Sequence, residues 1–361
     1  MKALVTGANG LIGANLVRAL LRQGAEVTGL VRASAQTGSI ANLPIRLAVG
    51  DVLDPASLEA AMAGQELVFH AAVTFSYWGQ DPASMARTAT EGSRNILTAA
   101  ARAGVRRVVM TSSSVTLGAS YGAQVRDESS NAADDPDEPA YVRAKIDQER
   151  EALATANDLG VEIVFACPTM SVGAFGASLG PSNGVVTSYL ADPLRLTWAG
   201  GCNIVSVQDV TEGHLLLAAS GEPGARYVLG GDNLTWREIH TLVAELTGTP
   251  PPRAEASAVA CCSLAIAEEA RARLTGRPPL ATRAQARMVG RYYWYSHARA
   301  ARLGYRPRPA RQAMAEAVAW LAASPHVSRE SRTALRLARD VHIARLARQD
   351  SEQALWLGGK G

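Results

Sequence analysis

The sequence contains no apolar run near the roughly 20 residues that a membrane-spanning helix needs, so we expect no membrane segment or membrane partner. Its four cysteines (Cys167, Cys202, Cys261 and Cys262) match the spacing of neither a metal site nor a disulfide framework, so we expect no metal. A strand-like stretch at residues 2–6 leaves no room for a signal peptide, and with the unpaired cysteines this predicts a reducing cytoplasm. The formal net charge is only +3 and its basic residues are spread along the chain, which argues against nucleic acid as a partner.

Lysine is nearly absent: the chain has 33 arginines but only three lysines, and Lys145 is the one that lies away from the termini. It follows Tyr141 by four residues, and in a helix these two positions share a face. A nearby ammonium favours phenolate and lowers a tyrosine pKa from its usual value of about 10. The pair predicts a tyrosine that exchanges protons near neutral pH, although the same spacing is common on solvated helices.

The first predicted strand, residues 2–6, leads through a glycine-rich turn into a predicted helix over residues 14–22. In this context Gly7 permits a tight turn, Gly10 lets a pyrophosphate approach the backbone, and Gly13 allows the helix to pack closely on the strand. The helix N-terminus then offers free N–H groups and a positive dipole to the phosphates. We therefore predict a dinucleotide site here.

The second predicted strand, residues 26–31, bears on which dinucleotide binds. An NAD site usually carries an acidic residue about 20 residues after the glycines, where it bonds the ribose 2′-hydroxyl. Here Arg32 follows the strand, with Ser34 close by, and a guanidinium can hold a 2′-phosphate through two charge-assisted bonds. NADP (as NADPH) is favoured over NAD, the alternative being that Arg32 is a solvated surface residue.

Predicted strands and helices continue to alternate through the first half of the chain. This alternation is typical of a parallel sheet covered by helices on both faces, so we predict an α/β fold with a doubly wound parallel sheet. The further strands are predicted at residues 45–49, 67–71, 107–111 and 161–166, and the helices at 55–63, 86–103 and 141–158.

From about Pro168 the alternation loosens into stretches rich in proline and glycine, which predicts a smaller C-terminal substrate lobe. The predicted boundaries are 1–167 plus about 203–230 for an NADP-binding domain, about 168–202 and 231–325 for the substrate-binding lobe, and 326–361 for a helical extension.

The extension contains one predicted amphipathic helix over residues 327–348. Leu337, Ala338, Val341 and Ala344 follow helical spacing, opposite a row of arginines. We expect this helix to pack on the surface and to be dispensable for chemistry.

Further short motifs accompany the glycine turn and the Tyr141–Lys145 pair. They are Asp51, His70-Ala71-Ala72, Thr111-Ser112-Ser113, Pro168-Thr169, Val205-x-Val207-x-Asp209-Val210, Gly230-Gly231-Asp232-Asn233 and Leu303-Gly304-Tyr305-Arg306-Pro307. Jointly they resemble the extended short-chain dehydrogenase/reductase family (the NAD-dependent epimerase/dehydratase superfamily) over about residues 1–322. The resemblance implies a Rossmann fold, a nicotinamide cofactor and, because family members often dimerise, a homodimer.

In that family a serine, a tyrosine and a lysine act together, and the resemblance assigns these catalytic roles to Ser113, Tyr141 and Lys145, with Ser112 and Ser114 as alternatives to Ser113. While hydride moves between nicotinamide and substrate, Tyr141 would transfer the proton and Ser113 would bond the same oxygen. Lys145 would lower the tyrosine pKa and hold the nicotinamide ribose. The implied cofactor-binding residues are Gly7, Asn9, Gly10, Leu11, Ile12, Gly13, Arg32, Asp51, Val52, Ala71, Ala72, Tyr141, Lys145 and Pro168.

Two departures from the family pattern bear on the reaction. Sugar-nucleotide epimerases usually carry Asn where this chain has Cys167, and an apolar residue before Pro-Thr looks more like dihydroflavonol reductases. Ala89 stands where many members carry Asn. Against a reductase, residues 203–309 also resemble proteins named hopanoid-associated sugar epimerases. A nucleotide-sugar epimerase or dehydratase with tightly held NAD(P) is therefore one alternative, and a catalytically silent NADP-binding protein is another.

Three aromatic residues follow the His70-Ala71-Ala72 motif in a chain with only 19 aromatics. They predict an apolar wall that faces the nicotinamide, unless they merely cap the core. With Trp198 as a further aromatic, they favour an NADPH-dependent reductase of a ketone or aldehyde that is small and apolar or aromatic. The predicted substrate-binding residues are Phe75, Tyr77, Trp78, Ser113 and Met170.

Overall fold

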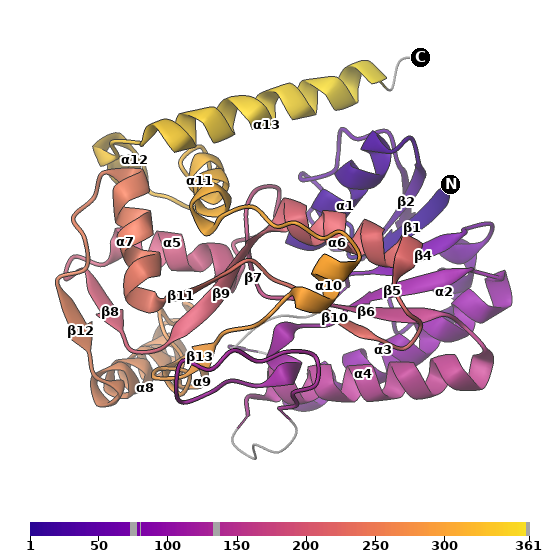
Figure 1. Ribbon diagram of the computed structural model, residues 1–361, viewed down its shortest axis with the longest axis horizontal. Helices are drawn as coiled ribbons and strands as arrows, with labels where there is room; N and C mark the ends of the chain where they lie inside the picture. Colours follow the sequence, from indigo (N-terminus) through magenta and orange to yellow (C-terminus); the bar gives the residue numbers. More distant parts are fainter. Residues whose placement is uncertain (73–77, 80, 133–137, 359–361) are drawn as a thin grey trace.

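The computed structural model describes residues 1–72, 78–79, 81–132 and 138–358, and Figure 1 shows its two lobes with a long C-terminal helix above them. The larger lobe is built on a seven-stranded parallel sheet with strand order β10-β6-β5-β4-β1-β2-β3. Its strands are β1 (Lys2–Thr6), β2 (Glu26–Val31), β3 (Arg46–Val49), β4 (Leu67–His70), β5 (Arg107–Thr111), β6 (Ile163–Pro168) and β10 (Arg226–Leu229). The predicted α/β fold with a doubly wound sheet is confirmed.

Alternate residues of each central strand face opposite sides of this sheet, and each side is closed by helices. Ala3 and Val5 of β1 join a core cluster with α1 (Leu11–Arg22) and α6 (Val207–Ser220). Leu4 between them joins the opposite cluster, which is covered by α2 (Pro55–Met62), α3 (Pro82–Ala103) and α4 (Ala140–Leu159).

The strand order reverses between β1 and β4. The chain runs outward from β1 to β2 and β3, then returns to place β4 on the other side of β1. In open α/β sheets, the carboxyl ends of the strands at such a switch point form the ligand crevice. The glycine turn after β1 and residues 71–72 after β4 both lie at this point.

The smaller lobe has its own sheet of β7 (Met170–Val172), β9 (Gly201–Ser206), β11 (Asp232–Thr235) and β13 (Tyr292–Tyr293). Strand β9 pairs with β7, β11 and β13, so the prediction that residues 203–206 belong to the first domain is wrong. The chain comes back to the larger lobe only with α6. The other elements are η1 (Ser114–Leu117), α5 (Pro181–Ala191), β8 (Leu196–Trp198), α7 (Trp236–Thr247), β12 (Ala254–Ala256), α8 (Ala258–Thr275), α9 (Arg283–Ala286), α10 (Ala298–Arg302), α11 (Ala310–Leu321), α12 (Arg329–Ala334) and α13 (Arg339–Gly358).

Several predicted boundaries shift. Helix α1 begins at Leu11 rather than at residue 14, because the turn enters the helix directly at Gly10. Helix α3 begins at Pro82 rather than at residue 86, because the Asp81 carboxylate caps it by accepting from Ser84 N. Strand β6 ends at Pro168 rather than at residue 166, because its last two residues pair with β10.

The C-terminal extension is not the single helix that the sequence predicted. Helices α12 and α13 are separated by an extended stretch in which Arg336 N donates to Thr247 O (2.9 Å) and Ala338 N donates to Leu246 O (3.0 Å). These bonds to the end of α7 take backbone groups that a continuous helix would use. The predicted apolar residues Leu337, Ala338, Val341 and Ala344 do pack on the core of the smaller lobe.

Helix α13 then reaches across to the larger lobe. Arg18 of α1, which is buried, lies under the ring of Phe175 and pairs with Glu352, its Nε 2.8 Å from Oε1. In the part of the chain that the structure describes, no helix is long and apolar enough to cross a membrane.

Candidate active site

The glycine turn is packed so tightly that side chains are excluded from it. Gly7 has φ +66°, and a Cβ there would lie 2.7 Å from Ala72 Cα and 2.9 Å from Ala71 O. A Cβ on Gly13 would lie 2.1 Å from Gly7 O. The turn is thus held against the end of β4 as well as against α1.

The N-terminus of α1 is left open for an anion. Its N-cap, Gly10, makes no side-chain cap bond, and no acidic residue stands in the first turn, which includes Leu11 and Ile12. Uncapped N–H groups and the positive end of the helix dipole suit a phosphate. Together with the crowded glycines, this open end fits the pyrophosphate of a dinucleotide.

Loops on two sides of the turn hold it in place. Asn9 Nδ2 donates to Gln36 O (3.2 Å) in the loop that follows β2, and Asn9 O accepts from Ala177 N (3.3 Å) in the smaller lobe. Arg32 stands at the start of the first loop, is exposed, and makes no ion pair or side-chain hydrogen bond with the described residues. Its guanidinium is therefore available to a ligand.

The loop after β3 has an ordered backbone. Asp51 Oδ1 accepts from Leu53 N (2.9 Å), and Val52 O accepts from Asn95 Nδ2 (3.0 Å) of α3. Val52 also packs on Gly92, where a Cβ would lie 3.0 Å from Val52 Cγ2. These contacts fix the Asp51 side chain near the carboxyl end of the sheet.

Helix α4 carries Tyr141 and Lys145 one turn apart, and both are buried, at 8% and 2% exposure. The sequence leaves three serines as candidates for the catalytic partner of Tyr141, but their contacts in the structure differ. The Ser112 hydroxyl donates to Glu149, whereas the Ser114 hydroxyl lies close to Tyr295 and the Ser113 hydroxyl lies close to Tyr141. These contacts favour Ser113 as the serine partner of Tyr141.

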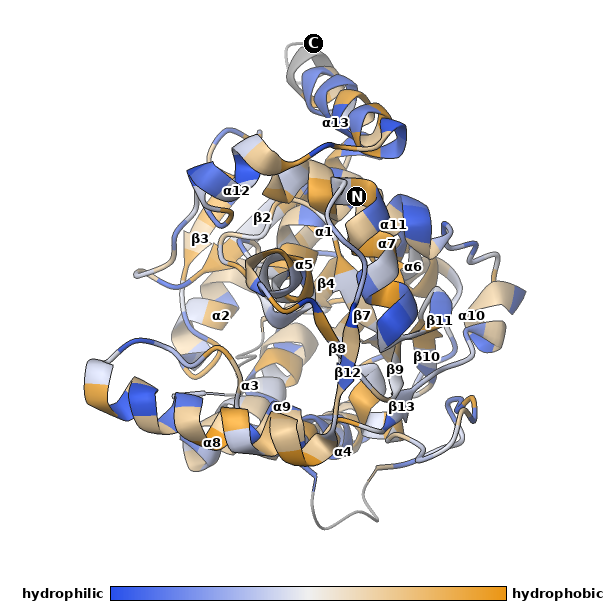
Figure 2. Cartoon of the chain, turned by 90° about the vertical axis from the view of Figure 1, so that its left-hand side faces the viewer, coloured by the Kyte–Doolittle hydropathy of each residue, from blue (hydrophilic) through white to orange (hydrophobic). Residues whose placement is uncertain are grey.

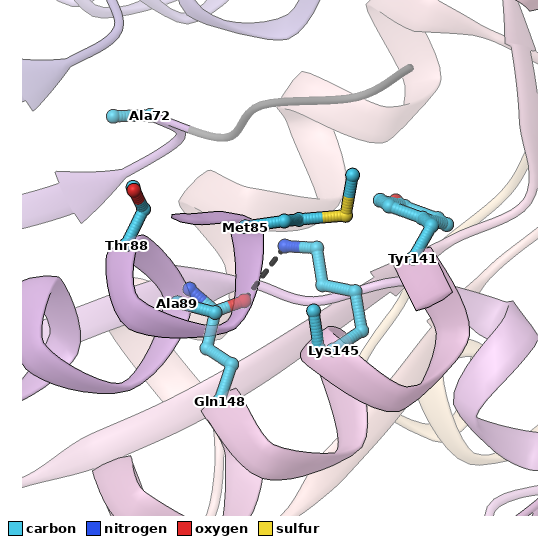
Figure 3. A pocket seen from close by; sticks show the side chains of 8 residues that line it. Ala72, Met85, Thr88, Ala89, Tyr141, Lys145 and Gln148 are labelled. Atoms are coloured by element: carbon cyan, nitrogen blue, oxygen red, sulfur yellow. Dashed lines mark hydrogen bonds between the residues drawn. The ribbon is translucent and has the colours of Figure 1, made fainter. Parts of the chain in front are cut away.

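The ammonium of Lys145 is held by two acceptors. Its Nζ donates to Thr111 O (2.9 Å) at the end of β5 and to Gln148 Oε1 (2.7 Å) on the next turn of α4 (Figure 3). Burial lowers the pKa of Lys145 to about 8, against the attraction of Glu149, which raises it. Lys145 is thus a cation that can lose its proton in mildly alkaline solution.

Burial raises the pKa of Tyr141 to about 12, and the hydrogen bond with Ser113 only partly offsets this. The prediction of a lowered Tyr141 pKa is therefore wrong for this arrangement, since desolvation of the phenolate is the largest effect. At neutral pH the phenol keeps its proton.

Tyr141 lies between two hollows. The inner one is small, and its described lining residues are Ala72, Met85, Thr88, Ala89, Tyr141, Ala144, Lys145 and Gln148 (Figure 3). The outer one is a cleft of about 350 Å³ between the two lobes. Its described lining residues are Trp78, Gly79, Pro82, Met85, Glu138, Pro139, Ala140, Tyr141, Arg143, Glu269, Arg283, Ala284 and Arg287. Ala89, the residue that departs from the family pattern, thus sits beside Lys145.

The predicted substrate residues are only partly brought to this cleft. Phe75 and Tyr77 lie outside the described residues, whereas Trp78 lines the cleft and lies under the guanidinium of Arg273 from α8 (5.6 Å to the ring centroid). Met170 and Trp198 line neither hollow, because both pack within the smaller lobe. Two of the three residues of the predicted apolar wall thus lie outside the described residues. The described lining of the cleft carries two glutamates and three arginines among its apolar residues.

A buried carboxylate behind the site was missed in the sequence. Glu149 lies one turn beyond Lys145 and accepts from Ser112, from Thr116 Oγ1 (3.1 Å) and from Cys167 Sγ (3.8 Å). Burial raises its pKa, while the hydrogen bonds from Ser112 and Thr116 and the charges of Arg226 and Lys145 lower it. Its spacing of four residues from Lys145 is the signal that could have identified it.

Among the described residues no cluster of histidine, cysteine or acidic side chains is arranged to hold a metal ion. Pro168, the last of the predicted cofactor residues, closes β6 at the same edge of the sheet as the glycine turn.

Comparisons with known proteins agree with this geometry. The sequence profile of the NAD dependent epimerase/dehydratase family matches residues 3–230. A Synechocystis sp. protein assigned as a dihydroflavonol 4-reductase is 34% identical over 321 residues, which cover 88% of this chain and 93% of the relative. Sterol demethylase protein B of Methylococcus capsulatus is 30% identical over 335 residues, or 89% and 98% of the two chains. The crystal structure of gox2253 superposes with a TM-score of 0.79 at 31% identity and covers 90% of this chain and 99% of its own.

Proposed function

The chain belongs to the NAD-dependent epimerase/dehydratase family of extended short-chain dehydrogenases/reductases, and we propose that it is an NADPH-dependent reductase of a ketone or aldehyde. The observation that carries the proposal is the position of Tyr141. This buried phenol lies close to Ser113 and one turn from Lys145, and it lines both the inner hollow and the cleft between the lobes.

The cofactor would be held by the uncapped end of α1 and by the strand ends that flank it, and when bound it supplies the hydride. The residues proposed for this role are those predicted from the sequence, from Gly7 to Pro168. Arg32 is proposed to give the preference for NADPH over NADH by binding the 2′-phosphate, since its exposed guanidinium has no partner among the described residues.

The proposed chemistry of the side chains follows from their protonation. With a pKa of about 12, Tyr141 is a neutral phenol at pH 7 and can give its proton to a carbonyl oxygen as negative charge develops there. Ser113 bonds to Tyr141 and can donate to the same oxygen. Lys145, a cation at pH 7 with a pKa of about 8, then stabilises the phenolate that remains.

Reduction is favoured over epimerisation by the relatives' names and by Cys167. Relatives named for dihydroflavonol reduction and for sterol demethylation support a polycyclic carbonyl compound as substrate. Cys167 is fully buried and its thiol donates to Glu149, so it offers no amide to a sugar diphosphate. The alternative is a nucleotide-sugar epimerase or dehydratase that retains NAD(P). A cytoplasmic location and a homodimer also remain proposals.

The test is a spectrophotometric assay at 340 nm with NADPH and a panel of aromatic and polycyclic ketones and aldehydes. Turnover that is lost in Tyr141→Phe, while NADPH still binds, would support the reductase. Inversion of a nucleotide sugar with no net change in the cofactor would replace it with the epimerase. NADPH binding without turnover across both panels would favour a silent binding protein.

A further inference from the structure

Helix α8 presents an apolar face to solvent. Val259, Leu264, Ile266 and Leu274 are 76%, 55%, 56% and 88% exposed, and Leu280 just beyond the helix is 82% exposed. These five account for over a third of the fourteen large hydrophobic side chains that are exposed in the described part of the chain. Val259, Ile266 and Leu274 are separated by seven and eight residues, so they lie along one face of the helix.

The acidic residues of α8 point the other way. Glu268 pairs with Arg271 (2.8 Å), and Glu269 pairs with Arg283 (2.8 Å) on α9. Their side chains are only 13% and 8% exposed. The outward face of α8 therefore shows no carboxylate to solvent.

The segment that contains this face is basic. Residues 253–287 contain six arginines and three glutamates, a net charge of +3 that equals the net charge of the whole chain. Arg253 and Arg277 are exposed and make no ion pair with the described residues. An apolar helix face bordered by cations is the pattern that binds the surface of an anionic membrane.

The same charges disfavour dimerisation through α8, because they would repel those of a second copy of the chain. Helix α8 has no acidic residue in its first turn, and Arg273 and Arg277 lie exposed at its C-terminal end, where Arg273 also pairs with the inward-facing Glu269 (3.5 Å). An antiparallel pair of α8 helices would place these cations against the positive N-terminal end of the other helix. A parallel pair would place them against their own copies. Anionic lipid headgroups complement them instead.

We propose that the outer face of α8 docks on an anionic lipid membrane. Figure 2 shows α8 along the lower edge of the molecule, away from the large sheet. Glu269 on its inner side lines the cleft with Arg283 and Arg287, so docking would place the cleft one helix away from the lipid surface. This surface contact needs no membrane span, but it departs from the expectation of no membrane partner, which rested on the absence of a long apolar run. Insofar as the proposed reductase function holds, a lipophilic carbonyl substrate reaches Tyr141 from the lipid phase.

The test is vesicle flotation of the full chain with phosphatidylcholine alone and with phosphatidylcholine mixed with phosphatidylglycerol. We expect binding to the mixed vesicles that weakens at least about tenfold in the double variant Ile266→Ser/Leu274→Ser, because membrane affinity scales with the apolar area buried. The matched control is Ile343→Ser/Leu346→Ser on α13, whose side chains are 54% and 61% exposed. For charge, Arg277→Glu should weaken binding, whereas Arg106→Glu, which reverses another exposed arginine, should not.

Three results would overturn the proposal. They are no flotation of the native protein with the mixed vesicles, equal loss in the α8 and α13 variants, and a native dimer in sedimentation that the α8 variant dissociates. Reduction of a water-soluble ketone should be the same in the α8 variant and the native chain. Docking and the reductase activity can therefore fail separately.

Discussion

The carboxylate of Glu149 accepts a hydrogen bond from Ser112, the residue that immediately precedes Ser113. This bond holds the turn that carries Ser113. The negative charge of Glu149 also raises the pKa of Lys145, so one carboxylate influences two of the proposed catalytic residues.

Replacing Glu149 with Gln should shift the pH dependence of the reductase. Without the anion, the pKa of Lys145 should fall from about 8 to a lower value, so the loss of kcat on the alkaline side should begin at lower pH, with little change in KM. Measuring kcat against pH for both proteins checks this. The control is Glu151→Gln, whose carboxylate pairs with Arg94 at the surface. An unchanged profile in Glu149→Gln would mean that the Lys145 charge does not limit the rate.

Removing the Arg32 side chain should weaken NADPH binding and leave NADH binding unchanged. A hydrogen bond to a charged group contributes about 1.5–3 kcal/mol, so Arg32→Ala should raise the Kd for NADPH by roughly 10- to 100-fold. Titration calorimetry with both cofactors measures this, with Arg106→Ala as the control at another exposed arginine. Equal losses for the two cofactors would remove Arg32 from the discrimination of the 2′-phosphate.

Acid should destabilise the fold partly through His214. The ring is buried between Thr111 Oγ1 (2.9 Å) and Val210 O (2.7 Å), and burial lowers its pKa to about 4. Because the unfolded chain binds the proton from about pH 6.5 downward, the stability that the neutral ring contributes is present above this pH and is lost as the pH falls towards 4. The loss is about 3 kcal/mol at most.

Urea unfolding at about pH 7 and about pH 4 measures this contribution. His214→Gln should show a smaller decrease between the two pH values than the native chain, and His342→Gln on the exposed side of α13 should show the same decrease as the native chain. A steeper decrease in His214→Gln would contradict the argument.

Glu352→Ala should lower stability without lowering kcat. It leaves the buried Arg18 guanidinium without its carboxylate, although Ala14 O and the Phe175 ring remain as partners. The expected cost is about 1–3 kcal/mol in the free energy of unfolding. The matched control on the same helix is Asp350→Ala, which changes an exposed acid. A folded Glu352→Ala variant with greatly reduced kcat would show that α13 shapes the active site.

What the sequence predicted well was local. The glycine turn and the Tyr141–Lys145 pair are set by short-range spacing and by the strand and helix on either side, so the sequence alone located them. Asp81 before Pro82 is a local capping signal too, and it was overlooked.

What the sequence did not predict depends on packing between distant segments. The Tyr141 pKa is raised because Met85 and Ala144 bury the ring, and no periodicity within α4 conveys that. Met170 failed as a substrate residue because β7 joins the second sheet, and residues 336–338 are extended because α7 offers two free carbonyls. Each of these outcomes needed the tertiary partner to be known.

Helix α13 packs on the smaller lobe through Val341 and pairs with the larger one through Glu352, so it spans the boundary between them. A wide hinge opening of the two lobes would have to break the contacts of α13 with one of them. Substrate and product should therefore exchange through local movement at the cleft, where Trp78 contacts Arg273, while the two lobes keep their relative positions.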